Sequence, residues 1–194
     1  PGSFDLAYRG CTPNLMILAP SDELELKHMV QTIYEIDTLP TCLRYPRGSA
    51  LGVEKLNDLF GYGLDEMPAQ GTALPVGKGR VVKPARDGAG VGQRVAILSL
   101  GTRLSHAVLA ARALEEEHEE LGVTVADARW MKPLDTELLR KRLATQEVVV
   151  TAQAAVAQEL VVAVMVLAAA AEELAAEVMA PVGEAQGRMP ATSS

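Results

Sequence analysis

The stretch Val95-Ala96-Ile97-Leu98-Ser99-Leu100 predicts a buried strand, and the segments that follow it decide the fold class. The elements expected next are a turn at Gly101-Thr102, a helix over 104–120 that ends before Gly122, a strand over 123–126, a helix from its Asp135 cap through Leu143, and a strand over 147–151. Strands that alternate with helices are typical of a parallel sheet covered by helices. The sequence therefore predicts an α/β domain with a small, mostly parallel sheet.

The first fifty residues predict a second strand, helix, strand unit. Its parts are a strand over 15–18, an N-cap at Ser21 with Asp22 and Glu23 in the first turn, a helix over 22–35, and a strand over 41–45 that Pro40 introduces. The apolar stripe of the helix is expected at Leu24, Met29, Val30, Ile33 and Tyr34. A short return between two such strands predicts parallel pairing through a right-handed crossover.

Residues 53–94 predict a connector between these two units, because glycine recurs in a polar stretch. The glycines are Gly61, Gly63, Gly71, Gly77, Gly79, Gly88, Gly90 and Gly92, and a short strand fits residues 79–83. We do not interpret residues 88–92 as a phosphate loop, because no strand leads in and no helix with a Lys-Ser or Lys-Thr pair follows.

Charge, cysteine count and hydropathy limit what the chain could bind and where it could lie. The net charge of −7 argues against nucleic acid, which requires a basic face. Cys11 and Cys42 are expected as free thiols in a reducing compartment. The apolar run over 160–171 has about twelve residues where a membrane span needs about twenty. We therefore expect no membrane span but a buried or partner-facing helix, extended by Ala and Glu through Val178.

The histidines do not indicate a metal site. His28 and His106 lie on two expected helices, and His118 lies within a run of glutamates whose charge surrounds its helix. A solvated helix face explains that run better than inward-facing metal ligands.

Two arginines lie at the end of the strand over 41–45, in Leu43-Arg44-Tyr45-Pro46-Arg47-Gly48. The planar guanidinium suits a phosphate or a carboxylate, and strand ends in α/β proteins are where ligands bind. The first hypothesis is that these arginines bind an anionic substrate. The alternative is a pair of surface arginines, one of them paired with a nearby Asp or Glu.

Four further stretches carry motifs as distinctive as this hexapeptide. They are Gly2-Ser3-Phe4-Asp5-Leu6-Ala7-Tyr8, Cys11-Thr12-Pro13-Asn14-Leu15, Ala19-Pro20-Ser21-Asp22-Glu23, and Asp127-Ala128-Arg129-Trp130-Met131-Lys132-Pro133-Leu134-Asp135. In this order and spacing, from Gly2 to about Val150, the chain resembles the 1-deoxy-D-xylulose-5-phosphate synthase family. The resemblance implies the C-terminal part of a transketolase-like pyrimidine-binding domain over 1–56, a linker over 57–94, a transketolase C-terminal-like domain over 95–180, and a disordered tail over 181–194.

The resemblance implies a transferase of the transketolase-like class, which depends on thiamine diphosphate and Mg²⁺. Its homodimers condense pyruvate with glyceraldehyde 3-phosphate, with loss of CO₂, to give a precursor of isoprenoids, thiamine and pyridoxal. The resemblance implies that Arg47 binds the phosphate of glyceraldehyde 3-phosphate, whereas Arg44 supports the loop. Asp5 and Tyr8 follow the family's active-site turn, where they could support the site or make a structural hydrogen bond.

The resemblance places no catalytic residue and no metal ligand in this chain, since the family's activating Glu, its active-site His and its diphosphate and magnesium ligands belong upstream. We therefore expect the chain alone to be inactive and to bind no cofactor. The alternative is a non-catalytic transketolase-like module that binds a partner or an anionic ligand. After Val150 the acidic pair and glycine-rich turn of the family are replaced, and divergence, truncation or a frameshift would each explain this. The compartment implied is the plastid stroma or the bacterial cytoplasm.

Overall fold

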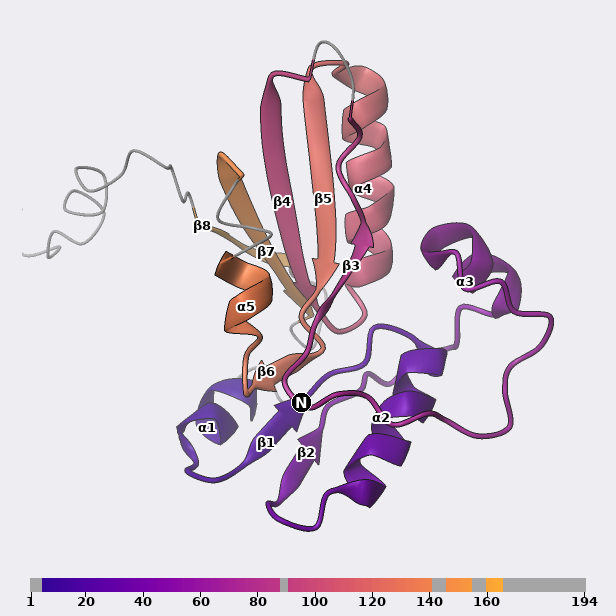
Figure 1. Ribbon diagram of the computed structural model, residues 1–194, viewed down its shortest axis with the longest axis vertical. Helices are drawn as coiled ribbons and strands as arrows, with labels where there is room; N and C mark the ends of the chain where they lie inside the picture. Colours follow the sequence, from indigo (N-terminus) through magenta and orange to yellow (C-terminus); the bar gives the residue numbers. More distant parts are fainter. Residues whose placement is uncertain (1–4, 88–90, 141–145, 155–159, 166–194) are drawn as a thin grey trace, which may run out of the picture.

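The structure, a computed structural model, describes residues 5–87, 91–140, 146–154 and 160–165. These residues form two open sheets, a five-stranded one in the upper part of Figure 1 and a three-stranded one in the lower part. No helix of the described part is long and apolar enough to cross a membrane.

The five-stranded sheet is parallel at its centre and antiparallel at both edges. Its strands are β3 (Arg80–Lys83), β4 (Gln93–Leu100), β5 (Leu121–Asp127), β7 (Val148–Ala154) and β8 (Leu160–Met165). Their order is β3-β5-β4-β7-β8; β4 pairs in parallel with β5 and β7, and β3 and β8 run antiparallel to their neighbours. The predicted mostly parallel sheet is confirmed.

Helices cover both faces of this sheet (Figure 1). α4 (Leu104–Glu117) packs Leu104 and Val108 against Ile97, Val123 and Val125. On the opposite face, Leu138 of α5 (Thr136–Leu138) packs near the small buried residues Ala96 and Ala126. Because neighbouring residues of a strand point to opposite faces, β4 contributes to both clusters.

The three-stranded sheet has the order β2-β1-β6 and combines distant parts of the chain. β1 (Met16–Leu18) pairs in parallel with β2 (Thr41–Leu43), as predicted, through α2 (Glu23–Glu35). β6 (Trp130–Lys132), which the sequence did not predict, pairs antiparallel with β1. The core beneath α2 consists of Leu18, Met29 and Trp130.

The details of α2 differ from the prediction in two ways. The N-cap is Asp22 instead of Ser21, and its carboxylate accepts a hydrogen bond from the Glu25 backbone N–H at 2.9 Å. The apolar stripe was partly wrong, because Val30 is 49% and Tyr34 81% exposed. The buried face of α2 instead carries the polar residues Glu25 and Thr32.

The segment expected as a connector contains two ordered elements. α3 (Val53–Phe60) was not predicted and ends at Gly61 in the left-handed conformation. The predicted strand over 79–83 is confirmed as β3, which forms one edge of the five-stranded sheet. Residues 88–90 of the rejected phosphate loop lie outside the described residues.

Two further helices were predicted in the second unit, and the structure tests their bounds as follows. The helix expected over 104–120 stops at Glu117, because β5 already begins at Leu121. The Asp135 cap is confirmed, and the expected end of that helix at Leu143 lies outside the described residues. α1 (Asp5–Cys11) precedes β1.

The helix predicted from residue 160 was wrong over residues 160–165, which form β8 beside β7. Three of these six residues, Val161, Val162 and Val164, are β-branched and favour a strand, and the edge of β7 supplies the hydrogen-bonding partner. The expected continuation of that helix through Val178 and the expected tail over 181–194 lie outside the described residues.

Candidate functional site

Arg47 lies on the loop that leaves β2, and its side chain is exposed. Among the described residues it makes no hydrogen bond and no ion pair. Three residues before it, the Arg44 backbone N–H donates to the Leu18 carbonyl at 2.9 Å and extends the pairing of β2 with β1 by one residue. The guanidinium of Arg47 thus lies on the loop just beyond the end of β2, exposed and with its donors available to an anion.

The other end of this loop is fixed by Glu23. The Glu23 carboxylate accepts one hydrogen bond from the Leu51 N–H at 3.2 Å and one from the Gly52 N–H at 2.7 Å. Gly52 has a φ of 88°, a region that favours glycine, and directly precedes α3. The loop over residues 44–52 is therefore tied to β1 at its start and to α2 at its end.

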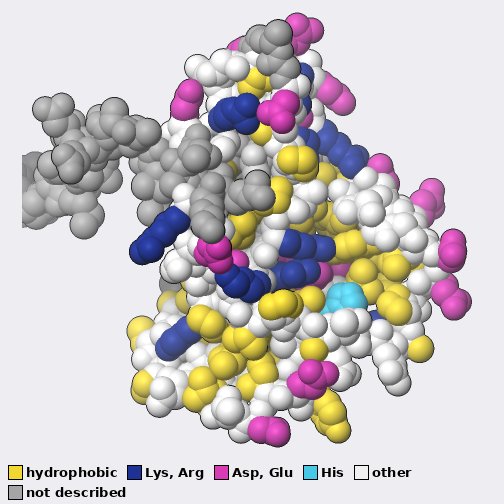
Figure 2. Space-filling view, viewed as in Figure 1, with side chains coloured by type: hydrophobic (Ala, Val, Ile, Leu, Met, Phe, Trp, Pro, Cys, Tyr) yellow, Lys and Arg dark blue, Asp and Glu magenta, His cyan; other side chains and the backbone are white. Residues whose placement is uncertain are grey.

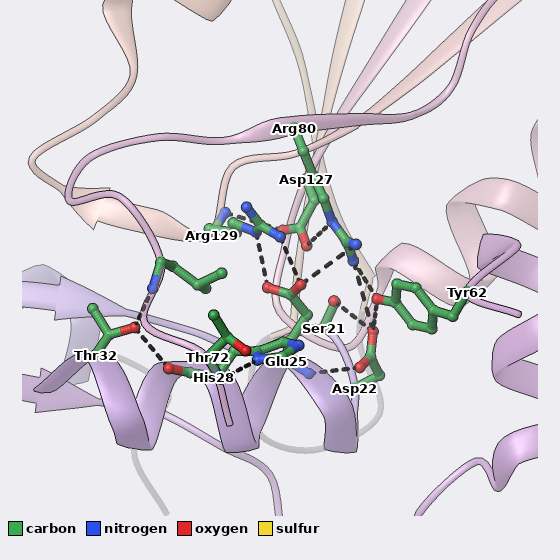
Figure 3. A network of polar contacts seen from close by, with 11 residues as sticks. Ser21, Asp22, Glu25, His28, Thr32, Tyr62, Thr72, Arg80, Asp127 and Arg129 are labelled. Atoms are coloured by element: carbon green, nitrogen blue, oxygen red, sulfur yellow. Dashed lines mark hydrogen bonds and ion pairs between the residues drawn. The ribbon is translucent and has the colours of Figure 1, made fainter. Parts of the chain in front are cut away.

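Two other arginines form a buried network between the two sheets (Figure 3). Arg129 follows β5 and donates from Nε and Nη2 to the two carboxylate oxygens of Glu25, at 2.8 and 2.7 Å. A bidentate contact of this kind is among the stronger polar interactions in proteins. Arg129 adopts a positive φ of 57°, and its backbone N–H donates to Asp127 Oδ1 at 3.0 Å.

Arg80 of β3 lies at the centre of the network. Its guanidinium is 3.4 Å from Glu25, 3.6 Å from Asp127 and 3.9 Å from Asp22. It also donates to the Tyr62 hydroxyl and stacks over the Tyr62 ring at 5.1 Å from the centroid. The Tyr62 hydroxyl in turn donates to Asp22 at 2.9 Å, so α2, β3 and β5 are joined through one residue.

Burial and the charges of the network together shift the pKa values of its members. Three carboxyl groups face two guanidiniums, so the network has one carboxyl group in excess. Burial raises the pKa of Asp127 to about 6, opposed by Arg80 and reinforced by the Glu25 carboxylate. Burial also raises the pKa of Tyr62. Burial opposes the charge of Arg80, yet the carboxylates of Glu25 and Asp127 outweigh it and raise the Arg80 pKa.

The charged groups of this network are paired with one another, whereas Arg47 has no partner among the described residues. Both guanidiniums already face carboxylates, so they have little capacity for an anionic ligand. Sequence reasoning missed Arg80, Glu25 and Arg129 as a group. Two signals were available in the sequence. Arg129 lies in one of the quoted motifs, and Glu25 is a charged residue between the apolar Leu24 and Leu26.

The remaining candidates from the sequence are dispersed. Tyr8 is 70% exposed, and the side chain of Asp5 is outside the described part. His28 accepts a hydrogen bond from the Thr72 N–H at 2.8 Å, and His118 lies 3.5 Å from Glu120 at the end of α4. The described residues contain no group of three His, Cys, Asp or Glu side chains that could hold a metal ion.

Lys and Arg side chains gather across the middle of the face in Figure 2, between the levels of the two sheets. Lys132 is bound to main-chain carbonyls of Gly10 and Thr12, and Lys78 to Glu137. These two lysines therefore join segments that lie far apart in the sequence.

Three comparisons with known proteins agree with this architecture. The family model for the transketolase C-terminal domain matches residues 88–192. A protein of Oryza sativa subsp. japonica named "Probable 1-deoxy-D-xylulose-5-phosphate synthase 2, chloroplastic" is 44% identical over 154 residues, which cover 78% of this chain and 19% of that protein. A solved chain described as "Split gene transketolase, inactive beta4 tetramer" has a TM-score of 0.57 and 26% identity, over 77% of this chain and 42% of its own length.

Proposed function

Since the chain belongs to the family of the transketolase C-terminal domain, we propose that it forms part of a 1-deoxy-D-xylulose-5-phosphate synthase. Such an enzyme joins pyruvate to glyceraldehyde 3-phosphate with loss of CO₂. The 44% identity to the rice protein supports this reaction over others of the transketolase class. The same relative is named as chloroplastic, which favours a plastid over a bacterial compartment.

Arg47 is proposed to bind the phosphate of glyceraldehyde 3-phosphate. The observation that carries this role is the exposed guanidinium without a described partner, on a loop tied down at both ends. A planar fork of donors can bind a dianionic phosphate through two parallel hydrogen bonds.

The contribution of Arg47 would be positional. Arginine keeps its proton at all working pH values, so it cannot act as an acid or a base. By holding the phosphate, it would fix the distance of the aldehyde carbon from the two-carbon unit that pyruvate supplies. Such positioning accelerates bond formation because it removes the entropy cost of bringing two reactants together.

The cofactor is not part of this proposal. Enzymes of this family depend on thiamine diphosphate, whose diphosphate needs a metal ion with oxygen ligands. In the described residues the buried carboxylates of Asp22, Glu25 and Asp127 face Arg80 and Arg129 instead. These residues do not fit the cofactor, so we assign this chain the acceptor side of the reaction only.

Steady-state kinetics of the full-length synthase test the role of Arg47. We expect Arg47→Ala to raise the KM for glyceraldehyde 3-phosphate much more than the KM for pyruvate, because only the former carries a phosphate. Loss of a charge-assisted contact is worth about 2–4 kcal/mol, so kcat/KM should fall roughly thirty- to a thousandfold. Arg47→Lys should recover only part of this, since an ammonium offers no paired donors.

Arg94→Ala is the matched control. It removes the same charge from the start of β4, where the side chain forms an exposed ion pair with Asp87 at 3.1 Å. Exposed pairs contribute little, so both KM values should stay near those of the wild type. Equal changes in both KM values for Arg47→Ala, or a loss of stability alone in a melting curve, would contradict the proposed contact.

A second candidate function concerns the chain by itself. The solved split-gene transketolase chain is described as an inactive tetramer, and the likeness to it extends over 77% of this chain. This favours a module without turnover when it is separated from the other domains of the enzyme. An assay of the isolated chain with both substrates, thiamine diphosphate and Mg²⁺ should give no product above background.

A further inference from the structure

The loop that carries Arg47 is held through its main chain. At its start, the Arg44 N–H donates to the Leu18 carbonyl of β1. At its end, two consecutive N–H groups, those of Leu51 and Gly52, donate to the two oxygens of the same carboxylate, Glu23. The loop thus has one anchor supplied by a strand and one supplied by a single side chain.

The position of Glu23 at the start of α2 leaves its carboxylate free to bind the loop. Glu23 is the first residue of α2, where a carboxylate would ordinarily interact with the N-terminal amides of its own helix. That role belongs to the buried Asp22, which caps the helix and also accepts hydrogen bonds from Ser21 and Tyr62. Because Asp22 already caps the helix, the Glu23 carboxylate is available to the loop.

We propose that Glu23 is a positioning residue for Arg47: its carboxylate holds the Leu51–Gly52 end of the loop and so sets where the Arg47 guanidinium meets the acceptor phosphate. The inference rests on the proposed function of Arg47. Glu23 itself touches no substrate, and its effect passes through the backbone of residues 47–52.

Kinetics in the full-length synthase distinguish positioning from a general loss of structure. We expect Glu23→Ala to raise the KM for glyceraldehyde 3-phosphate about tenfold and to leave the KM for pyruvate within about twofold. Glu23→Gln should fall between wild type and Glu23→Ala, because a carboxamide keeps one oxygen acceptor but turns a donor toward the second N–H. A merely structural role would lower kcat and affect both KM values together.

Glu54→Gln is the matched control for charge. Glu54 is exposed in the first turn of α3, two residues after Gly52, so its substitution removes a negative charge near the same loop end without removing a hydrogen bond to the loop. Both KM values should remain those of the wild type. An acceptor KM that rises as much in Glu54→Gln as in Glu23→Gln would overturn the proposal, since charge alone would then account for the effect.

A double-mutant cycle tests whether Glu23 acts through Arg47. If it does, adding Glu23→Ala to Arg47→Ala should change the acceptor KM by less than about twofold beyond Arg47→Ala alone. Fully additive effects would overturn the proposal. An acceptor KM that responds to Arg47→Ala and not to Glu23→Ala would overturn the role of Glu23 alone, whereas an acceptor KM that does not respond to Arg47→Ala would overturn both roles.

Amide hydrogen exchange provides a readout that does not depend on activity. In Glu23→Ala the Leu51 and Gly52 amides should exchange about tenfold faster, while the Arg44 amide, bonded to Leu18, should keep its wild-type rate. Unchanged exchange at Leu51 and Gly52 would show that the carboxylate does not hold the loop, and would overturn the proposal.

Discussion

The carboxyl group of Asp127 links burial to pH-dependent stability. It is fully buried, and its pKa is raised to about 6 from an ordinary value of 3.8. Between these two pH values the folded chain binds a proton that the unfolded chain releases, so stability falls as pH rises through this window. A shift of this size corresponds to about 3 kcal/mol.

Asp127→Asn should remove this dependence. The Asn side chain keeps an oxygen for the Arg129 N–H but cannot ionise, so its stability relative to wild type should rise by about 3 kcal/mol between pH 4 and pH 7. Urea unfolding at several pH values measures this difference. Asp58→Asn, which alters an exposed carboxylate paired with Arg112, is the control and should show no such trend. A difference between Asp127→Asn and wild type that does not vary with pH would contradict the burial argument.

Single residues also show which parts of the candidate site could be predicted from the sequence. Arg47 could be identified because its motif is local and its exposed side chain needs no partner to be recognised. Arg80 could not, because its partners Asp22, Glu25 and Asp127 come from α2 and from the end of β5. Only the folded chain brings these four residues together. Whether Arg47 binds phosphate remains a prediction.

At the level of elements, alternation of apolar strands and helices was sufficient for the centre of the five-stranded sheet and for the β1–α2–β2 unit. The Ala-rich stretch from residue 160 misled us, because its composition did not show that the edge of β7 lies beside it. Gly71 and Gly79 were counted among the glycines of the expected connector. In the structure a Cβ at Gly71 would lie 2.1 Å from the Lys27 carbonyl oxygen, and one at Gly79 would lie 2.7 Å from that of Asp127.

Gly71→Ala should therefore destabilise the fold. The atom in the way is backbone of α2 and cannot move aside as a flexible side chain would, so we expect a loss of about 1–3 kcal/mol. Gly48→Ala is the control, because a Cβ there meets nothing within 4 Å. Its effect should stay within about 0.5 kcal/mol. Thermal or urea unfolding of both variants measures the contrast, and equal stabilities would contradict the close packing of residue 71 on α2.

At the scale of the whole molecule, α2 and the segments before and after β2 carry several exposed large apolar side chains. They include Val30, Tyr34, Leu39 and Tyr45, with exposed fractions of 49%, 81%, 36% and 63%. An apolar surface of this kind tends to associate with another protein surface.

We expect the chain to self-associate at tens of micromolar, the range of weak interfaces. Sedimentation velocity of the wild type and of Tyr34→Lys tests this, with Leu109→Lys, which alters an exposed apolar residue on α4, as the control. Tyr34→Lys should shift the distribution toward monomer, and Leu109→Lys should not. A wild type that sediments as a monomer would contradict the prediction.

The pairing of β6 with β1 has a consequence for the order in which the chain acquires its structure during synthesis. Ile17 is paired with Lys132, and the Ala19 N–H donates to the Arg129 carbonyl at 3.0 Å. A ribosome must therefore add more than a hundred residues after β1 before the partner strand exists, and contacts this distant in sequence form slowly. Until then one edge of β1 and the apolar side chains that later surround Trp130 remain open to water and to chaperones, although the residues that form them were added to the chain much earlier.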